Sequence, residues 1–140
     1  ITGYTQVYLF LGLPLEPLLQ DLERYMEQFE KFEKTSVSFV FNAFSQGIHC
    51  LCGKTSDPYV LSGDIIKETT FLQDVHDNAI ARWAFHFMKL YVAYHLNQDI
   101  PELEHAAQAF WTQGVPLKGT PIFFLMNYAF LNGMAAMALE

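Results

Sequence analysis

Apolar residues recur every three or four positions along most of the chain, which is the period of an amphipathic α-helix. The pattern is clearest over residues 15–33, where charged residues fill the opposite face and the pairs Glu27–Lys31 and Glu30–Lys34 lie four apart. The apolar positions of this segment are Leu15, Leu18, Leu19, Leu22, Tyr25, Met26, Phe29 and Phe32. We therefore predict one helix over residues 15–33, preceded by a shorter apolar helix that begins near Tyr4.

Three further segments follow before the middle of the chain. Thr35 or Ser36 can cap a helix that runs to about Cys52, and Gly53 is a typical residue to end it. The predicted apolar face of this helix consists of Val37, Val40, Phe41, Phe44 and Ile48. Residues 53–63 read as a loop, and a short helix is predicted from Asp64 to about residue 73.

The second half of the chain has three start signals. Asp77 or Asn78 can begin a long helix that runs to about residue 97 and has only a narrow polar stripe. The stripe consists of Asn78, Arg82, His86 and Lys89, whereas Ile80, Trp83, Ala84, Phe87, Leu90, Tyr91 and Tyr94 cover the rest. Asp99-Ile-Pro-Glu102 has the spacing of a capping box before a helix that ends near residue 113. Gly119-Thr120-Pro121 then introduces the last helix.

Helices of this length joined by short turns predict an all-α fold of stacked antiparallel hairpins. The tetratricopeptide (TPR) pattern fits in part, because Ala106-x3-Phe110 matches the second helix of a repeat and Pro116 lies near the repeat's proline. The small residue of the first helix, however, would fall on Tyr94. We predict a TPR-like, right-handed helical array that forms a single domain over residues 1–138.

Composition narrows the class of protein. The chain has 140 residues, of which 51% are hydrophobic and 16% charged, and this length lets one domain bury roughly 70% of its unfolded surface. The net charge of −7 argues against a nucleic-acid partner, which needs a basic surface. Cys50 and Cys52 would not face each other on a helix, which favours free thiols and the cytoplasm.

The two ends of the chain are both apolar. The segment 121–139 is long enough to span a membrane, but Asn127, Asn132 and Gly133 interrupt it, so we predict a buried helix. The chain opens on Ile1 without an initiator Met, and its last two residues, Leu-Glu, match a cloning remnant at 139–140. We therefore expect an excised part of a longer protein, with terminal helices that could form a homodimer.

The sharpest chemical motif is Gly53-Lys54-Thr55-Ser56, which resembles the end of a phosphate-binding P-loop. The full motif places its first Gly at position 48, where this chain has Ile48. Ser56-Asp57-Pro58 also breaks the helix whose N-terminus should hold the phosphate. We interpret the motif as a helix C-cap followed by a turn.

Metal and redox motifs are incomplete. Glu102-x-x-His105 has the helical spacing of one di-iron ligand pair, but no second copy exists. Cys50-x-Cys52 is not a Cys-x-x-Cys motif. We assign no catalytic, cofactor-binding or metal-binding residue. The aromatic positions predict a core or, less favoured, a groove for an apolar ligand; they are Trp83, Phe85, Phe87, Tyr91, Tyr94, Phe110, Trp111, Phe123, Phe124, Tyr128 and Phe130.

Several short stretches together resemble one family. They are Tyr8-Leu-Phe-Leu-Gly12, Leu22-Glu-Arg-Tyr-Met26, Leu61-Ser-Gly63, Asp74-Val-His76, Asp77-Asn78, Ala93-Tyr-His-Leu96, Leu103-Glu-His-Ala-Ala107 and Thr120-Pro-Ile-Phe-Phe124. Their order resembles the helical region of large bacterial signalling proteins. Those proteins combine a serine/threonine-kinase-like domain, an AAA/STAND ATPase, a TPR-like array, a GAF domain and a histidine kinase. Glu33-Lys-Thr-Ser36 and Asp64-Ile-Ile-Lys67 depart from the family pattern.

The resemblance implies a non-catalytic scaffold within a bacterial signal-transduction kinase of the two-component type. ATP binding and phosphorylation would belong to other domains of the parent protein. The expected partners are neighbouring domains or another protein. A small-molecule sensor with an apolar ligand between its helices is the second hypothesis, and a metal-dependent helical enzyme is the third.

Overall fold

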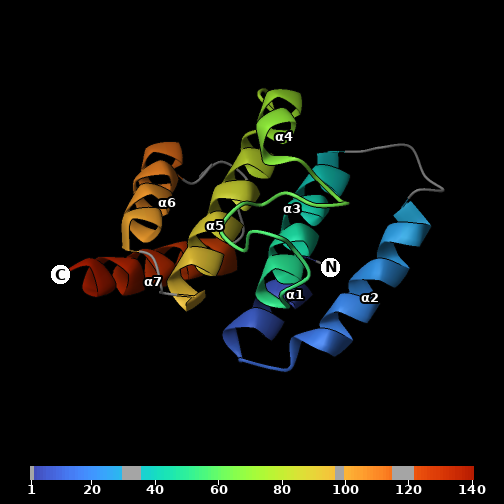
Figure 1. The fold of residues 1–140 in the computed structure, drawn as a ribbon, viewed down its shortest axis with the longest axis horizontal. Coiled ribbons are helices and arrows are strands. Elements are labelled where there is room, and N and C mark those ends of the chain that lie inside the picture. The colour runs from blue at the N-terminus through green and yellow to red at the C-terminus, as the bar shows by residue number, and fades with distance from the viewer. Residues whose placement is uncertain (1, 30–35, 97–99, 115–121) are drawn as a thin grey trace.

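A computed structural model describes residues 2–29, 36–96, 100–114 and 122–140. Its helices are α1 (Thr2–Phe10), α2 (Leu15–Phe29), α3 (Ser36–Leu51), α4 (Glu68–Asp74), α5 (Ala79–Leu96), α6 (Ile100–Gln113) and α7 (Ile122–Leu139) (Figure 1). No strand occurs among the described residues, and the predicted all-α class is confirmed.

The helix boundaries follow the local sequence signals at two described positions. Asn78 caps α5, because its side-chain Oδ1 accepts a hydrogen bond from the Ala81 N–H at 3.0 Å. Gly53 ends α3 with a φ of +69°. The Gly53 N–H donates to the Cys50 carbonyl and the Lys54 N–H donates to the His49 carbonyl, which is a Schellman motif.

The short helix differs from the prediction in its start. It begins at Glu68 and not at Asp64. Residues 64–67 turn back on themselves instead, since the Gly63 N–H donates to the Ile66 carbonyl at 2.8 Å. Several other predicted signals lie outside the described residues: Lys31 and Lys34 of the ion pairs, the Thr35 cap, Asp99 of the capping box and the Gly119-Thr120-Pro121 start.

Helix α5 is the centre of the fold. It packs against α3, α6 and α7, and Figure 1 shows it between α3 and α6 with α7 crossing behind it. Gly47 lets α3 approach α5 closely, because a Cβ at this position would overlap the Met88 side chain. The all-round apolar pattern of this helix correctly predicts packing on several sides.

An aromatic cluster joins four helices around Phe87. Ring centroids within 6.3 Å of the Phe87 ring belong to Phe10, Phe44, Trp83, Tyr91 and Phe110. These rings come from α1, α3, α5 and α6, so the cluster is the point where distant parts of the chain share one core. The interpretation of the aromatic positions as core is confirmed for four of them, which are buried: Trp83, Phe87, Tyr91 and Phe110.

The first and last helices touch each other. Asn127 Nδ2 in α7 donates to Gln6 Oε1 in α1 at 2.9 Å, and both side chains are buried. The Phe10 and Phe130 rings also meet, with centroids 5.6 Å apart. In an open array each unit contacts only its neighbours. The contact between α1 and α7 closes the helices on one another, and a TPR-like array is not confirmed.

Some residues predicted to lie on buried faces are exposed. Val37 is 54% and Ile80 51% exposed, although both continue the apolar stripe of their helix. Trp111 and Phe130 are also more than one-third exposed. Periodicity assigns a residue to a face, but it does not tell how far along that face the neighbouring helix extends.

Helix α7 is likewise buried on one side only. Leu131 and Ala135 are buried, whereas Met126 and Met137 are more than 60% exposed. The predicted buried helix is therefore wrong for the outer side of α7. Within the described part of the chain, no helix combines the length and the apolar character that a membrane span requires.

Candidate functional site

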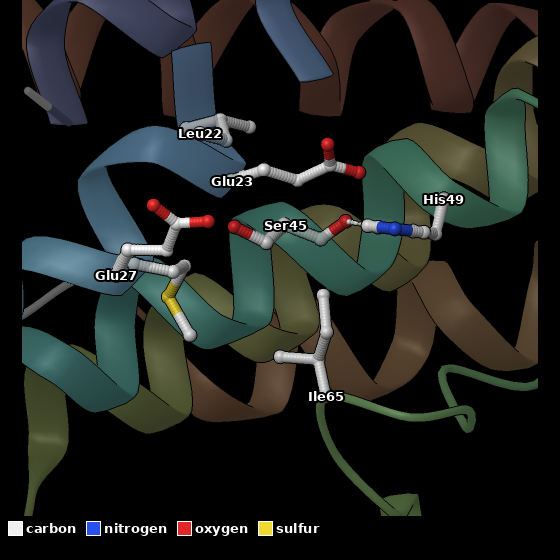
Figure 2. Close-up of a pocket in the computed structure, with 7 residues that line it drawn as sticks. Leu22, Glu23, Glu27, Ser45, His49 and Ile65 are labelled. Carbon is white, nitrogen blue, oxygen red and sulfur yellow. Dashed lines mark hydrogen bonds between the residues drawn. The ribbon is translucent and has the colours of Figure 1, made fainter. Parts of the chain in front are cut away.

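A pocket of about 320 Å³ lies between α2, α3 and the segment that precedes α4; we call it the α2/α3 pocket (Figure 2). Its lining residues are Leu22, Glu23, Met26, Glu27, Ser45, His49 and Ile65. Helical spacing explains the arrangement. Glu23 and Glu27 are four residues apart on α2, and Ser45 and His49 are four apart on α3, so each pair lies on one face of its helix.

The segment that carries Ile65 is fixed by polar contacts. The Glu68 carboxylate accepts hydrogen bonds from Lys89 Nζ at 2.8 and 2.9 Å and from the Leu61 N–H at 2.9 Å. The Glu68 N–H in turn donates to Ser62 Oγ at 2.9 Å. Leu61 is fully buried. These contacts hold the irregular segment against α5 and thereby place Ile65 at the pocket.

The hydrogen-bonding state of His49 follows from its partner. Its Nδ1 lies 2.8 Å from the Ser45 carbonyl oxygen, as the dashed line in Figure 2 shows. A carbonyl oxygen can only accept, so Nδ1 carries the hydrogen in this contact. In the neutral ring, Nε2 is then a hydrogen-bond acceptor.

Ser45 is the most unusual residue of the pocket. It is 1% exposed, and its Oγ has no hydrogen-bond partner among the described residues. A serine inside a helix commonly donates back to the carbonyl four residues earlier, but this hydroxyl does not. Buried polar groups without a partner are rare in native proteins, so the Ser45 hydroxyl makes this pocket a candidate site for a polar group.

The rim of the pocket is acidic. Glu23 and Glu27 are both exposed at its opening. The ion pairs found among the described residues are Arg24–Asp21, Lys54–Glu16, His76–Asp77 and Lys89–Glu68, and none of them includes a glutamate of the rim.

A second hollow, the α5/α6 cleft, has a volume of about 540 Å³. It is lined by Arg82, His86, His105, Gln108, Ala109, Thr112 and Gln113. Burial, and after it the nearby positive charge of Arg82, lowers the pKa of His86 to about 4. His86 is therefore neutral at pH 7 and contributes no positive charge to this cleft.

A third feature is a set of exposed apolar residues on and next to α1 and on α7; we call it the apolar face. Its exposed residues are Tyr4 and Val7 on α1, Leu11 in the turn after α1, and Met126, Phe130 and Met137 on α7. Neither helix contains a charged residue. A groove of about 340 Å³ between α1, α5 and α7 adjoins the face, with Phe10 and Phe130 in its lining.

Comparison of the chain with models of protein families, with curated proteins and with solved structures found no match.

The P-loop-like motif lies at the C-terminal end of a helix. Lys54 is the last residue of the Schellman motif of α3, and the next helix begins only at Glu68. Thr55 Oγ1 donates to the Asp57 carbonyl at 3.3 Å, which closes a turn. The interpretation as a C-cap followed by a turn is confirmed. The carbonyl end of a helix carries partial negative charge, which disfavours a phosphate group.

The other motifs singled out in the sequence do not converge on a site. Cys50 and Cys52 are free thiols, and burial raises the pKa of each. His105 lies in the α5/α6 cleft beside His86, whereas Glu102 does not line it. Among the described residues, no group of three or more His, Cys, Asp or Glu side chains could hold a metal ion.

Sequence reasoning missed the α2/α3 pocket. The four-residue spacings of Glu23 with Glu27 and of Ser45 with His49 were visible, but spacing on single helices does not say which faces meet. It also missed the ion pair of Glu68 with Lys89, because these residues are 21 positions apart.

Proposed function

We propose that this chain is a non-catalytic helical interaction module that binds through its apolar face. The observation that carries the proposal is the exposure of Met126, Phe130 and Met137 at 65%, 56% and 64% on a helix without charges. Single exposed apolar residues are ordinary on soluble proteins, but these three are spaced four and seven positions apart, which places them on one side of α7. A contiguous apolar surface marks an interaction site.

The occupant that we propose for this face is a second copy of the chain. A two-fold contact requires one surface to complement itself. The apolar face supplies both a protruding and a recessed surface. Met126 and Met137 are exposed on α7, and the adjoining groove can receive side chains of the other copy. The net charge of −7 lies outside α1 and α7, so two copies can meet there without opposing like charges.

Analytical ultracentrifugation over a range of protein concentrations tests this proposal. We expect a monomer–dimer equilibrium that the double variant Met126→Glu/Met137→Glu shifts to the monomer, since charges buried without a partner strongly oppose association. The matched control is Ile80→Glu, at a residue 51% exposed on α5, which should leave the equilibrium unchanged. A wild-type chain that stays monomeric at every concentration would contradict the proposal.

The wider setting that we propose is a cytoplasmic, multidomain bacterial signal-transduction kinase. The support is the resemblance of the helical motifs to the TPR-like region of such proteins. In that setting the helices would connect neighbouring domains, and ATP chemistry would lie elsewhere in the parent. The purified chain should then neither bind nor hydrolyse ATP. ATP binding that Lys54→Ala abolishes would overturn this assignment.

A small-molecule sensor is the second candidate function. The specific observation in its favour is the α2/α3 pocket, which combines apolar walls with the buried, unpartnered hydroxyl of Ser45. Ligand pockets have this composition, a mainly apolar lining with a few inward polar groups. Ligand-induced stabilisation of the chain would distinguish this function from a purely structural role.

A further inference from the structure

We propose that the α2/α3 pocket binds a small organic cation, a primary ammonium group on a short apolar body. This inference goes beyond the interaction module and does not depend on the apolar face, because the two surfaces share no lining residue. Three properties of the pocket determine the ligand class: its polar groups, its apolar walls and its size.

The polar groups of the pocket are mainly hydrogen-bond acceptors. The carboxylates of Glu23 and Glu27 can only accept. In the neutral ring, His49 uses its Nδ1 hydrogen on the Ser45 carbonyl, and its Nε2 is then an acceptor as well. A complementary ligand must therefore donate hydrogen bonds and carry positive charge. An ammonium group does both, since it has three donors and no acceptor.

Ser45 supplies the inner contact. Its hydroxyl oxygen has no partner among the described residues and is fully buried at the pocket. An ammonium hydrogen donated to this oxygen would satisfy the group once the side chains that cover the oxygen move aside, and the exposed carboxylates at the rim would attract the cation from solution. The pocket therefore has an acidic entrance and a polar interior.

The apolar walls of the pocket favour an organic cation over a metal ion. Leu22, Met26 and Ile65 line the pocket between its polar groups. A bare metal ion gains nothing from such walls, and the described side chains offer no set of three metal ligands. An alkyl or aryl body buries apolar surface there. The volume of about 320 Å³ is at the small end of ligand pockets and suits an amine of about six to eight carbon atoms.

The first experiment uses three matched ligands on the full chain: n-hexylamine, n-hexanol and hexanoate at equal ionic strength, followed by two-dimensional NMR and calorimetry. We expect saturable binding of the amine, with shifts centred on residues of α2 and α3 that line the pocket. The alcohol should bind at least about tenfold more weakly, and the carboxylate should not bind, because the rim repels it.

The variants test the assigned contacts. The double variant Glu23→Gln/Glu27→Gln should weaken hexylamine binding about tenfold and leave hexanol binding unchanged. The control Asp74→Asn/Glu104→Gln removes two charges at exposed positions outside the pocket and should have no effect on the affinity.

We expect Ser45→Ala to change the Tm of the free chain and the affinity for hexylamine in opposite directions. Removing a buried hydroxyl without a partner should raise the Tm of the free chain, yet the affinity for hexylamine should fall. A lost affinity together with a lowered Tm would instead indicate a merely structural serine.

Three results would overturn the proposal: no saturable binding of hexylamine at millimolar concentration, equal binding of hexanol, or shifts centred on the apolar face of α1 and α7. These outcomes are independent of the dimer, which sedimentation measures without any ligand. The hexylamine titration repeated on the variant Met126→Glu/Met137→Glu tests the pocket without the apolar face, and the affinity should not change.

Discussion

Gly53 occupies a backbone conformation that other residues reach only with strain. Its φ is +69°, and an added Cβ would meet no atom within 4 Å, so any cost of substitution comes from the backbone. We expect Gly53→Ala to lower the free energy of unfolding by about 1 kcal/mol in urea denaturation. The control Gly133→Ala lies inside α7 with open space around it, and it should raise that free energy by about 0.5–1 kcal/mol. Equal effects of both variants on the free energy of unfolding would contradict the view that the Gly53 backbone conformation requires glycine.

His86 makes the stability depend on pH. Burial, the positive charges of Arg82, Lys89 and His105, and the opposing charge of Glu68 together place its pKa at about 4, against 6.5 in the unfolded chain. Between these values the unfolded chain binds the extra proton, so stability is complete above pH 6.5 and falls as the pH drops towards 4. The loss is on the order of 2 kcal/mol after allowance for partial solvent exposure.

Urea denaturation of wild type and His86→Gln at pH 7 and at pH 4.5 measures this contribution. The variant cannot take up the proton, so its stability should fall less between the two pH values than that of the wild type. An equal loss of unfolding free energy between pH 7 and pH 4.5 in His86→Gln and wild type would exclude His86 as the source of the pH dependence.

At the scale of elements, Glu68 joins the irregular segment before α4 to the central helix. Its carboxylate binds Lys89 and the Leu61 N–H, and the Glu68 and Lys89 side chains are 24% and 13% exposed. We expect Glu68→Ala to lower the free energy of unfolding by roughly 2–3 kcal/mol, because it leaves a mostly buried ammonium group without a partner. Chemical denaturation measures this loss.

The companion variant Glu68→Gln separates the ion pair from the packing. Its amide oxygen can still accept one hydrogen bond, so it should lose less stability than Glu68→Ala. Asp74→Ala, which removes an exposed carboxylate at the end of α4, is the control and should change stability by less than about 0.5 kcal/mol. An equal loss for Asp74→Ala would show that the α4 charge, and not the Glu68 contact, is responsible.

At the scale of the whole molecule, α1 is the element that distinguishes a closed bundle from an open array. Leu9 is buried, and its carbonyl accepts a hydrogen bond from the Tyr91 hydroxyl at 2.9 Å. Gln6 bonds Asn127 in the last helix. Deletion of residues 1–13 therefore removes contacts to the centre and to the far end of the chain together.

We expect this deletion to abolish the cooperative unfolding transition and to increase binding of a hydrophobic dye. Burial of an apolar side chain contributes about 1.5–3 kcal/mol, and several such losses approach the whole stability of a domain. In an open array the remaining units would stay folded. Tyr4→Ser/Leu11→Ser, which changes only exposed side chains within the deleted segment, is the control and should keep the transition. A truncated chain that unfolds cooperatively would support the array.

The described helices were largely predictable because their signals are local. Asn78 and Gly53 marked helix ends by their own chemistry, and the stripe of α2 included its buried leucines. The start of α4 was predicted too early, because contacts of residues 63–66 with each other and with Gln46 compete with helix formation. The site was not predictable, since Ser45 resembles an ordinary helical serine until its surroundings are known.

The sequence by itself determined the all-α class, because helical periodicity and caps depend on neighbours within a few positions. It also excluded a complete P-loop at Gly53. Only the tertiary structure decided that α1 closes onto α7 and that the acidic face of α2 meets Ser45 and His49 of α3. The physical reason is that packing between distant helices depends on the shape and volume of whole faces, which no local pattern specifies.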